Sequence, residues 1–211
     1  MMPSTRRSFL STVGALAGAT VLPDLAGAEP VSQGGWDMSW LDRITGKHRQ
    51  VFDMHDMEVG LGTVYNWLEA HLTVYGLRHP DLSAVVGIGG AAFPMNATDP
   101  MYQKFPIGEL WKVNDPATGK PALRNIFVEG GTSPAERESK VKALQARGVI
   151  FWQCNNALHV VSARIAARVQ RPEAEVYTEL RAGLNPGVIL IPAHTMLIGL
   201  AQEHGCAYQM L

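Results

Sequence analysis

The feature of this sequence that most constrains its fold is a repeated alternation of short apolar runs with longer amphipathic segments. The apolar runs, of strand length, are residues 50–54, 82–88, 149–152, 188–191 and 207–210. Between them lie segments with the apolar spacing or the capping residues of helices: residues 60–75, 134–147, 156–168, 172–181 and 195–204. This alternation predicts an α/β fold, with a mostly parallel five-stranded sheet covered by helices on both faces.

Parallel strands end at one edge of their sheet, and ligands of open α/β folds bind outside that edge. We therefore expect a functional site where the predicted strands end. The residues placed there are His55 and Asp56 after the first strand, Gly89 and Gly90 after the second, Cys154, Asn155 and Asn156 after the third, and Ala193, His194 and Thr195 after the fourth.

The segment between the second and third strands is too long for an ordinary connection. Residues 91–132 contain five prolines and two turn signals, Asn114-Asp115 and Thr118-Gly119. We expect an insertion here that leaves the main domain, with a small hairpin formed by residues 110–113 and 123–127. Insertions of this kind serve as lids, binding loops or oligomer contacts.

The first residues have the layout of a twin-arginine signal peptide. Arg6 and Arg7 precede an apolar stretch over residues 13–25, which is shorter than the ~20 apolar residues of a membrane span, and Ala26-Gly27-Ala28 is a small-x-small cleavage site. The sequence thus predicts a signal peptide at 1–28, a lead-in at 29–46 and an α/β domain at 47–211. We expect a periplasmic protein without stable membrane insertion after cleavage, and export in the folded state favours a bound cofactor.

The charge of the predicted mature chain is close to zero. Without Arg6, Arg7 and Asp24, 16 basic and 18 acidic residues remain. A balance of this kind disfavours nucleic acid or an anionic membrane as a partner. The expected partner is a small molecule or another protein.

Two cysteines, Cys154 and Cys206, have different predicted positions. Cys154 lies where the third strand gives way to a helix, whose positive end favours a thiolate. Cys206 starts the last strand, at the opposite edge of the sheet, so the two sulfurs should be about a strand length, ~15 Å, apart. Because a disulfide requires Cα atoms within ~7 Å, we predict that the two do not form a bridge.

Three stretches carry a resemblance to a known family. Residues 148–158 (GVIFWQCNNAL), 188–193 (VILIPA) and 200–208 (LAQEHGCAY) resemble the DsrE/DsrF-like family of small α/β sulfur-relay proteins. The likeness runs from about Lys47 to the end, interrupted by residues 91–132. It implies a flavodoxin-like three-layer sandwich, homo-oligomers that are trimers or hexamers, and a persulfide on Cys154 that passes sulfur from a donor to an acceptor.

Histidines provide the other candidate groups for chemistry. His55 and His194 both follow strands at the predicted site, where either could polarise Cys154 or, together with it, bind a transition metal or haem. Asp56, which lies beyond its strand, is a better candidate than Asp53 to orient a histidine. The remaining five histidines are expected to be structural or solvated.

Three functions follow from these residues. The preferred one is a periplasmic sulfur-handling or thiol-redox protein with Cys154, His194 and His55 as catalytic groups and with ligand-binding residues Asn155, Asn156, Gly89, Gly90 and Asp56. The alternative is a non-enzymatic protein that binds a metal or haem through His55, His194 or Cys154. A third possibility is a scaffold that serves only for assembly. A dinucleotide site at residues 87–90 is rejected, because no helix and no third glycine follow.

Overall fold

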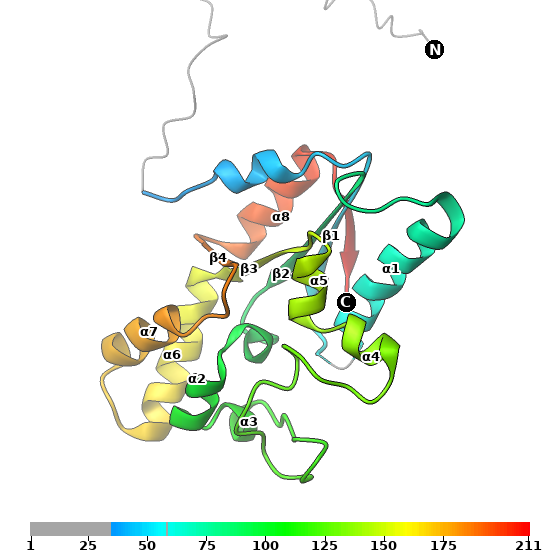
Figure 1. Ribbon diagram of the computed structural model, residues 1–211. Helices are drawn as coiled ribbons and strands as arrows, with labels where there is room; N and C mark the ends of the chain where they lie inside the picture. Colours follow the sequence, from blue (N-terminus) through cyan, green and yellow to red (C-terminus); the bar gives the residue numbers. More distant parts are fainter. Residues whose placement is uncertain (1–34, 58) are drawn as a thin grey trace, which may run out of the picture. The chain divides into compact units, whose positions relative to one another are not determined.

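The sheet of this protein consists of five parallel strands in the order β4-β3-β2-β1-β5 (Figure 1). The computed structural model describes residues 35–57 and 59–211, so the predicted signal peptide lies outside the described residues. Residues Trp36–Leu211 form one compact unit. The strands are β1 (His48–Met54), β2 (Leu82–Ile88), β3 (Ile150–Cys154), β4 (Val188–Ile191) and β5 (Ala207–Met210).

Helices cover both faces of this sheet, and the connections divide unequally between them (Figure 1). The connections from β1 to β2, β2 to β3 and β3 to β4 pack on one face, called here the α1 face. The last long helix and a short 3-10 helix near the start pack on the other, called the α8 face. The α1 face carries α1 (Gly60–Tyr75), η2 (Phe93–Asn96), α2 (Asp99–Lys104), α3 (Ile107–Leu110), α4 (Pro134–Glu138), α5 (Val141–Ala146), α6 (Asn155–Val169) and α7 (Glu173–Ala182), whereas the α8 face carries η1 (Ser39–Arg43) and α8 (His194–Glu203).

Successive strand residues alternate between these faces, as the pleat of a β-strand requires. In β1, Phe52 and Met54 pack with the α1 face, and Val51 packs with the α8 face. In β3, Phe151 belongs to the α1 face and Trp152 to the α8 face. Every residue of β2 and β3 is buried, because helices exclude water from both sides.

The predicted fold class is confirmed. The protein is α/β, with an all-parallel five-stranded sheet flanked by helices, and these layers are consistent with a flavodoxin-like sandwich. In the flavodoxin strand order 2-1-3-4-5, the edge strand next to strand 1 is strand 2, the second of the chain. In this protein the edge strand next to β1 is β5, the last of the chain.

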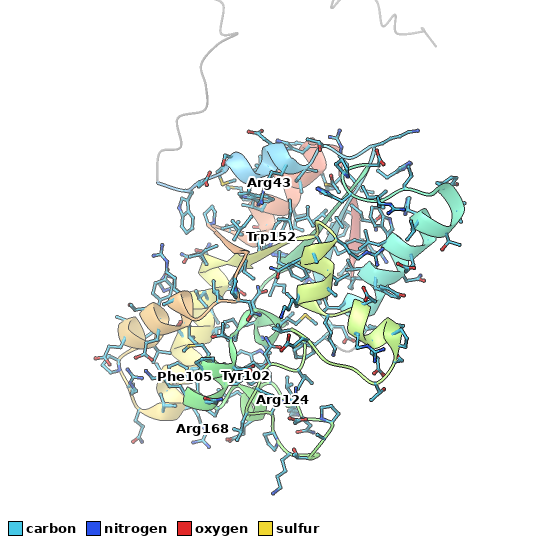
Figure 2. The ribbon with its side chains drawn as sticks, viewed as in Figure 1. Arg43, Tyr102, Phe105, Arg124, Trp152 and Arg168 are labelled. Atoms are coloured by element: carbon cyan, nitrogen blue, oxygen red, sulfur yellow. The ribbon has the colours of Figure 1, made fainter. Side chains whose placement is uncertain are left out.

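The connection from β2 to β3 differs from its prediction. Residues 91–132, expected to leave the domain, supply some of its most buried side chains: Phe93, Tyr102, Phe105 and Ile107 are each at most 2% exposed. Figure 2 labels Tyr102 and Phe105, which pack with α6 and α7 in one apolar cluster. The insertion is therefore not confirmed as a separate excursion.

Two local predictions in this connection are wrong. The expected hairpin of 110–113 with 123–127 is absent from the described residues, where α3 and turns occupy the region and only the isolated bridge Asn114–Pro121 forms. The single helix expected at 134–147 is divided into α4 and α5. The backbone of Lys140 is extended, and the N–H groups of Val141 and Lys142 donate to the carbonyls of Phe127 and Val128. These long-range bonds replace a continuous helix.

Within the described residues, no helix is both long enough and apolar enough to cross a bilayer.

Candidate functional site

The carboxyl ends of β3 and β4 form the point where the chain changes faces. These two strands are neighbours, yet β3 is followed by α6 on the α1 face and β4 by α8 on the α8 face. In open parallel sheets, the separation of two such helices makes the crevice in which ligands bind. Cys154 and His194, the residues that end β3 and begin α8, therefore occupy the position that the topology favours for a site.

The sulfur of Cys154 accepts hydrogen bonds from the backbone at the start of both helices. The Ala157 N–H donates to Sγ at 3.4 Å, so that Cys154 is the N-cap of α6. The His194 N–H, in the first residue of α8, donates to the same atom at 3.3 Å. These N–H groups have no partner within their own helices, and each lies at the positive end of a helix dipole. The sulfur thus accepts one N–H donor from a helix on each face of the sheet.

Cys154 is also buried, with 4% of its surface exposed. It packs on the α8 face with Trp152, Ile191 and Leu197. The residues that follow it and those that precede α8 are less covered: Asn155, Ala193 and His194 are partly exposed, and Asn156 is exposed. The sulfur therefore lies at the predicted edge of the sheet but beneath the residues that form its rim.

The imidazole of His194 is held between two side chains. Its Nδ1 accepts a hydrogen bond from the indole N–H of Trp152 at 3.1 Å, and its Nε2 lies 2.7 Å from Oδ1 of Asp53. Because an indole nitrogen can only donate, Nδ1 carries no proton, and the neutral ring must be protonated at Nε2. The ring is thus fixed in the tautomer that donates to Asp53, and it does not point at the sulfur of Cys154.

A glycine makes room for this ring. Asp53, Gly87 and Trp152 form a row across β1, β2 and β3, since Asp53 pairs with Gly87 and Gly87 with Trp152. A Cβ atom at Gly87 would lie 2.6 Å from Cζ2 of Trp152 and 2.9 Å from Cε1 of His194. The imidazole therefore covers the missing side chain and spans from Trp152 to Asp53. Figure 2 shows Trp152 near the 3-10 helix that carries Arg43, and the ring of Trp40 in that helix lies 5.7 Å from the indole of Trp152.

Asp53 accepts hydrogen bonds from three side chains. Besides His194, Nε2 of His55 lies 3.0 Å from Oδ1, and the hydroxyl of Tyr208 donates to Oδ2 at 2.9 Å. Burial acts to raise the pKa of this carboxyl, but the hydrogen bonds from His194 and Tyr208 outweigh it and leave the pKa below its ordinary value. The same carboxylate raises the pKa of the Tyr208 hydroxyl. Asp53 thus links β1, β5 and α8 as an ionised acceptor.

The two cysteines are not bonded to each other, so the prediction that they form no bridge is confirmed. Cys206 is 6% exposed and belongs to the same apolar cluster as Cys154. Burial raises the pKa of the Cys206 thiol to about 11. Among the described residues, no backbone N–H donates to its sulfur, in contrast to the two that donate to the sulfur of Cys154.

The structure brings some of the predicted site residues together and separates others. His194 and His55 meet at Asp53, and the hydrogen bonds of their imidazoles in the described part of the chain do not include Cys154. Asn155 follows Cys154 and accepts a hydrogen bond from the Tyr177 hydroxyl at 2.6 Å. On the α1 side of the edge, the carbonyl of Gly90 accepts from the Trp111 indole at 3.0 Å, and that of Gly89 accepts from Gln153 at 3.4 Å. Asn156 is exposed at the start of α6.

Asp53, which the sequence analysis ranked below Asp56, is the carboxylate that contacts both His194 and His55. Asp56 is exposed, and its backbone N–H donates to the carbonyl of Leu211. Sequence reasoning also missed Trp152, Tyr208 and Gly87. One signal pointed to Asp53: it is a lone carboxylate in an apolar strand, and buried carboxylates in proteins have partners. Its position two residues from Val51 places it on the α8 face.

The side chains present do not fit a metal or haem through His194 in this arrangement. Both of its ring nitrogens are hydrogen-bonded, and a ligand bond would have to replace one of these interactions. Across residues 35–57 and 59–211, no group of three or more His, Cys, Asp and Glu side chains is arranged to hold a metal ion.

Comparison with known proteins adds no assignment to this geometry. No protein-family model matches the chain, and no curated protein matches it either.

Proposed function

We propose that this protein is a thiol-based sulfur carrier in which Cys154 accepts and donates a sulfane sulfur. One observation carries the proposal: the sulfur of Cys154 accepts N–H donors from the first turns of two helices that lie on opposite faces of the sheet. Donors of this kind stabilise negative charge on a thiolate or on a persulfide. The resemblance of residues 148–158 to sulfur-relay proteins supports the same chemistry.

The transfer needs only one cysteine. The Cys154 thiolate attacks the outer sulfur of a donor such as thiosulfate, a new S–S bond forms, and the bond between that sulfur and the sulfite group breaks, so that sulfite leaves with the electron pair. The thiolate of an acceptor then attacks the outer sulfur of the persulfide and releases the Cys154 thiolate. Neither step requires an external oxidant or reductant, because each exchanges one S–S bond for another.

In this proposal His194 acts through its backbone and not as a base. Its ring is fastened to Trp152 and Asp53, and this fixes the first residue of α8, whose N–H faces the sulfur. His55 contributes by its contact with the same carboxylate. Because Cys154 is 4% exposed, a donor reaches the sulfur only when residues that cover it move, and the bound sulfur is otherwise shielded from water.

The test compares the two cysteines. Cys154→Ser keeps an N-cap acceptor for α6, and Cys206→Ala removes the other thiol, which is also buried. After incubation with thiosulfate and peptide mapping by mass spectrometry, the wild-type protein and Cys206→Ala should carry one added sulfur on residue 154, and Cys154→Ser should carry none. Iodoacetamide in the native state measures access to the same thiol. The proposal is contradicted if thiosulfate leaves Cys154 unmodified. This holds even where iodoacetamide does not react with Cys154, because the thiol of a sulfur carrier must be accessible to the sulfur donor.

We propose that this carrier works in the periplasm and that it assembles into trimers or hexamers. The first part depends on residues 1–28 and the second on the family resemblance. The mass of the protein isolated from a periplasmic extract tests cleavage after Ala28, and light scattering coupled to gel filtration measures the size of the assembly.

A further inference from the structure

A groove of about 870 Å³ lies on the α1 face, away from Cys154. Its walls are the first turns of α1 with Met57 before them, the segment around Trp111, and α4 with the residues that follow it. The volume lies in the range of small-molecule sites, which is roughly 300–1,000 Å³. Three aromatic side chains, Tyr65, Trp111 and Phe127, line it. The groove is large enough for a ligand and has walls that favour an apolar one.

The walls are held by hydrogen bonds, so the groove does not depend on a ligand to form. The indole of Trp111 donates to the Gly90 carbonyl at 3.0 Å, and the guanidinium of Arg164 lies 4.6 Å from the centre of the Trp111 ring. The N–H of Val141 donates to the Phe127 carbonyl at 2.9 Å. A site that is already ordered loses little conformational entropy on binding.

The charge in the groove is positive. The ammonium of Lys140 is partly buried and donates one hydrogen bond, to the Ile126 carbonyl at 2.8 Å. Lys112 lies on the rim. The one carboxylate of the lining, Glu136, is engaged in capping α4, since its Oε2 accepts from the backbone N–H groups of Thr132 and Ser133. The groove is thus lined by two lysines and one carboxylate, and Glu136 interacts electrostatically with Lys140. One positive charge of the lining is left in excess.

We propose that this groove binds a carboxylate with an apolar body, such as a medium-chain fatty acid or an arylalkanoic acid. The hydrocarbon lies against Tyr65, Trp111 and Phe127. The carboxylate accepts hydrogen bonds from the N–H groups of Lys140 that do not donate to Ile126. A ligand that fills the groove removes water from Lys140, and a buried ammonium is costly unless an anion pairs with it. With a neutral or cationic ligand of the same length, only the electrostatic interaction with Glu136 offsets that cost.

The first experiment measures charge selectivity. Octanoate, octanol and octylammonium are titrated into the full chain by isothermal calorimetry, with competition checked by saturation-transfer NMR. We expect octanoate to bind at least about tenfold more tightly than the other two, because a charge-assisted hydrogen bond supplies that difference. Lys140→Met should remove the preference, and Lys142→Met, which alters an exposed lysine paired with Glu129, should leave it intact. Equal binding of the three ligands, or no binding, overturns the proposal.

The second experiment blocks the groove without disturbing its walls. Gly62 lines the groove within α1, and a Cβ atom there meets no atom within 4 Å. Gly62→Trp should therefore fill the groove and weaken octanoate binding more than tenfold, whereas Gly62→Ala should bind as the wild type does. Unchanged binding by Gly62→Trp, with its helix content and unfolding midpoint preserved, overturns the site. Cys154→Ser should bind octanoate normally, so this test and the test of sulfur transfer fail independently.

Discussion

The carboxyl edge of the sheet is filled by side chains on the α8 face and borders an open groove on the α1 face. On the α8 face the space is filled by the imidazole of His194, which lies over Gly87 and joins Trp152 to Asp53. On the α1 face the same edge borders an open groove near Trp111. The two proposed sites thus lie on opposite faces of one sheet: directed hydrogen bonds fix the atoms beside the sulfur on one face, and mostly apolar walls enclose an open groove on the other.

The largest loss of stability is expected at Gly87, where the α8 face has no room for a Cβ atom. In Gly87→Ala, the added Cβ lies 2.6 Å and 2.8 Å from two ring atoms of Trp152 and 2.9 Å from His194, in the central strand of the sheet, whose residues are all buried. We expect a loss of about 3 kcal/mol in the free energy of unfolding, measured with urea. Gly89→Ala is the matched control, because a Cβ there meets no atom within 4 Å. If Gly87→Ala loses no more stability than Gly89→Ala, the row Asp53–Gly87–Trp152 is loosely packed.

The next effect tests the carboxylate of the filled face. Asp53→Asn places an amide group against the donors His194, His55 and Tyr208, and we expect a loss of about 2 kcal/mol at neutral pH. Tyr208→Phe, which removes one of the three donors, should cost less. A loss in Tyr208→Phe as large as in Asp53→Asn would argue against a shared acceptor.

The pH dependence of stability gives a separate measurement of the same group. The pKa of Asp53 is lowered in the folded state, so the stabilisation is complete above the ordinary value of 3.8 and is lost as the pH falls through the folded value. Between pH 5 and 2, the free energy of unfolding of the wild type should therefore fall more steeply than that of Asp53→Asn. Parallel curves would mean that Asp53 is not the group responsible.

A smaller loss of stability is expected when the hydrogen bond from the Trp152 indole to His194 is removed. Trp152→Phe keeps an aromatic ring in the core but removes the donor to Nδ1 of His194, and we expect a loss of about 1.5 kcal/mol. The nitrogen chemical shifts of His194 distinguish this role from simple packing. In the wild type they should show a single tautomer protonated at Nε2, and in Trp152→Phe a mixture of both. A single tautomer in both proteins would assign the control of the ring to Asp53.

The fold and the site could be predicted from the sequence to different depths. The alternation of apolar runs and helices is a local property, and it sufficed to predict all five strands and to place Cys154 and His194 at one edge. The row Asp53–Gly87–Trp152 depends on the register of three strands distant in sequence, which no local pattern specifies. For the same reason Asp53 was passed over in favour of Asp56. The division between α4 and α5 likewise depends on bonds to residues 127 and 128.

The smallest effects compare one glycine in each covering helix. Gly62 lies inside α1 and Gly199 inside α8, and a Cβ atom at either position meets no atom within 4 Å. Alanine restricts the unfolded chain and favours the helix, so each substitution should raise the free energy of unfolding by about 0.5–1 kcal/mol. Urea unfolding of the two variants and of the double variant measures this, and the gains should add because the helices lie on opposite faces. A gain for Gly199→Ala without one for Gly62→Ala would mean that the groove wall needs the flexibility of its glycine, and the groove would then not be the preformed site that its hydrogen bonds indicate.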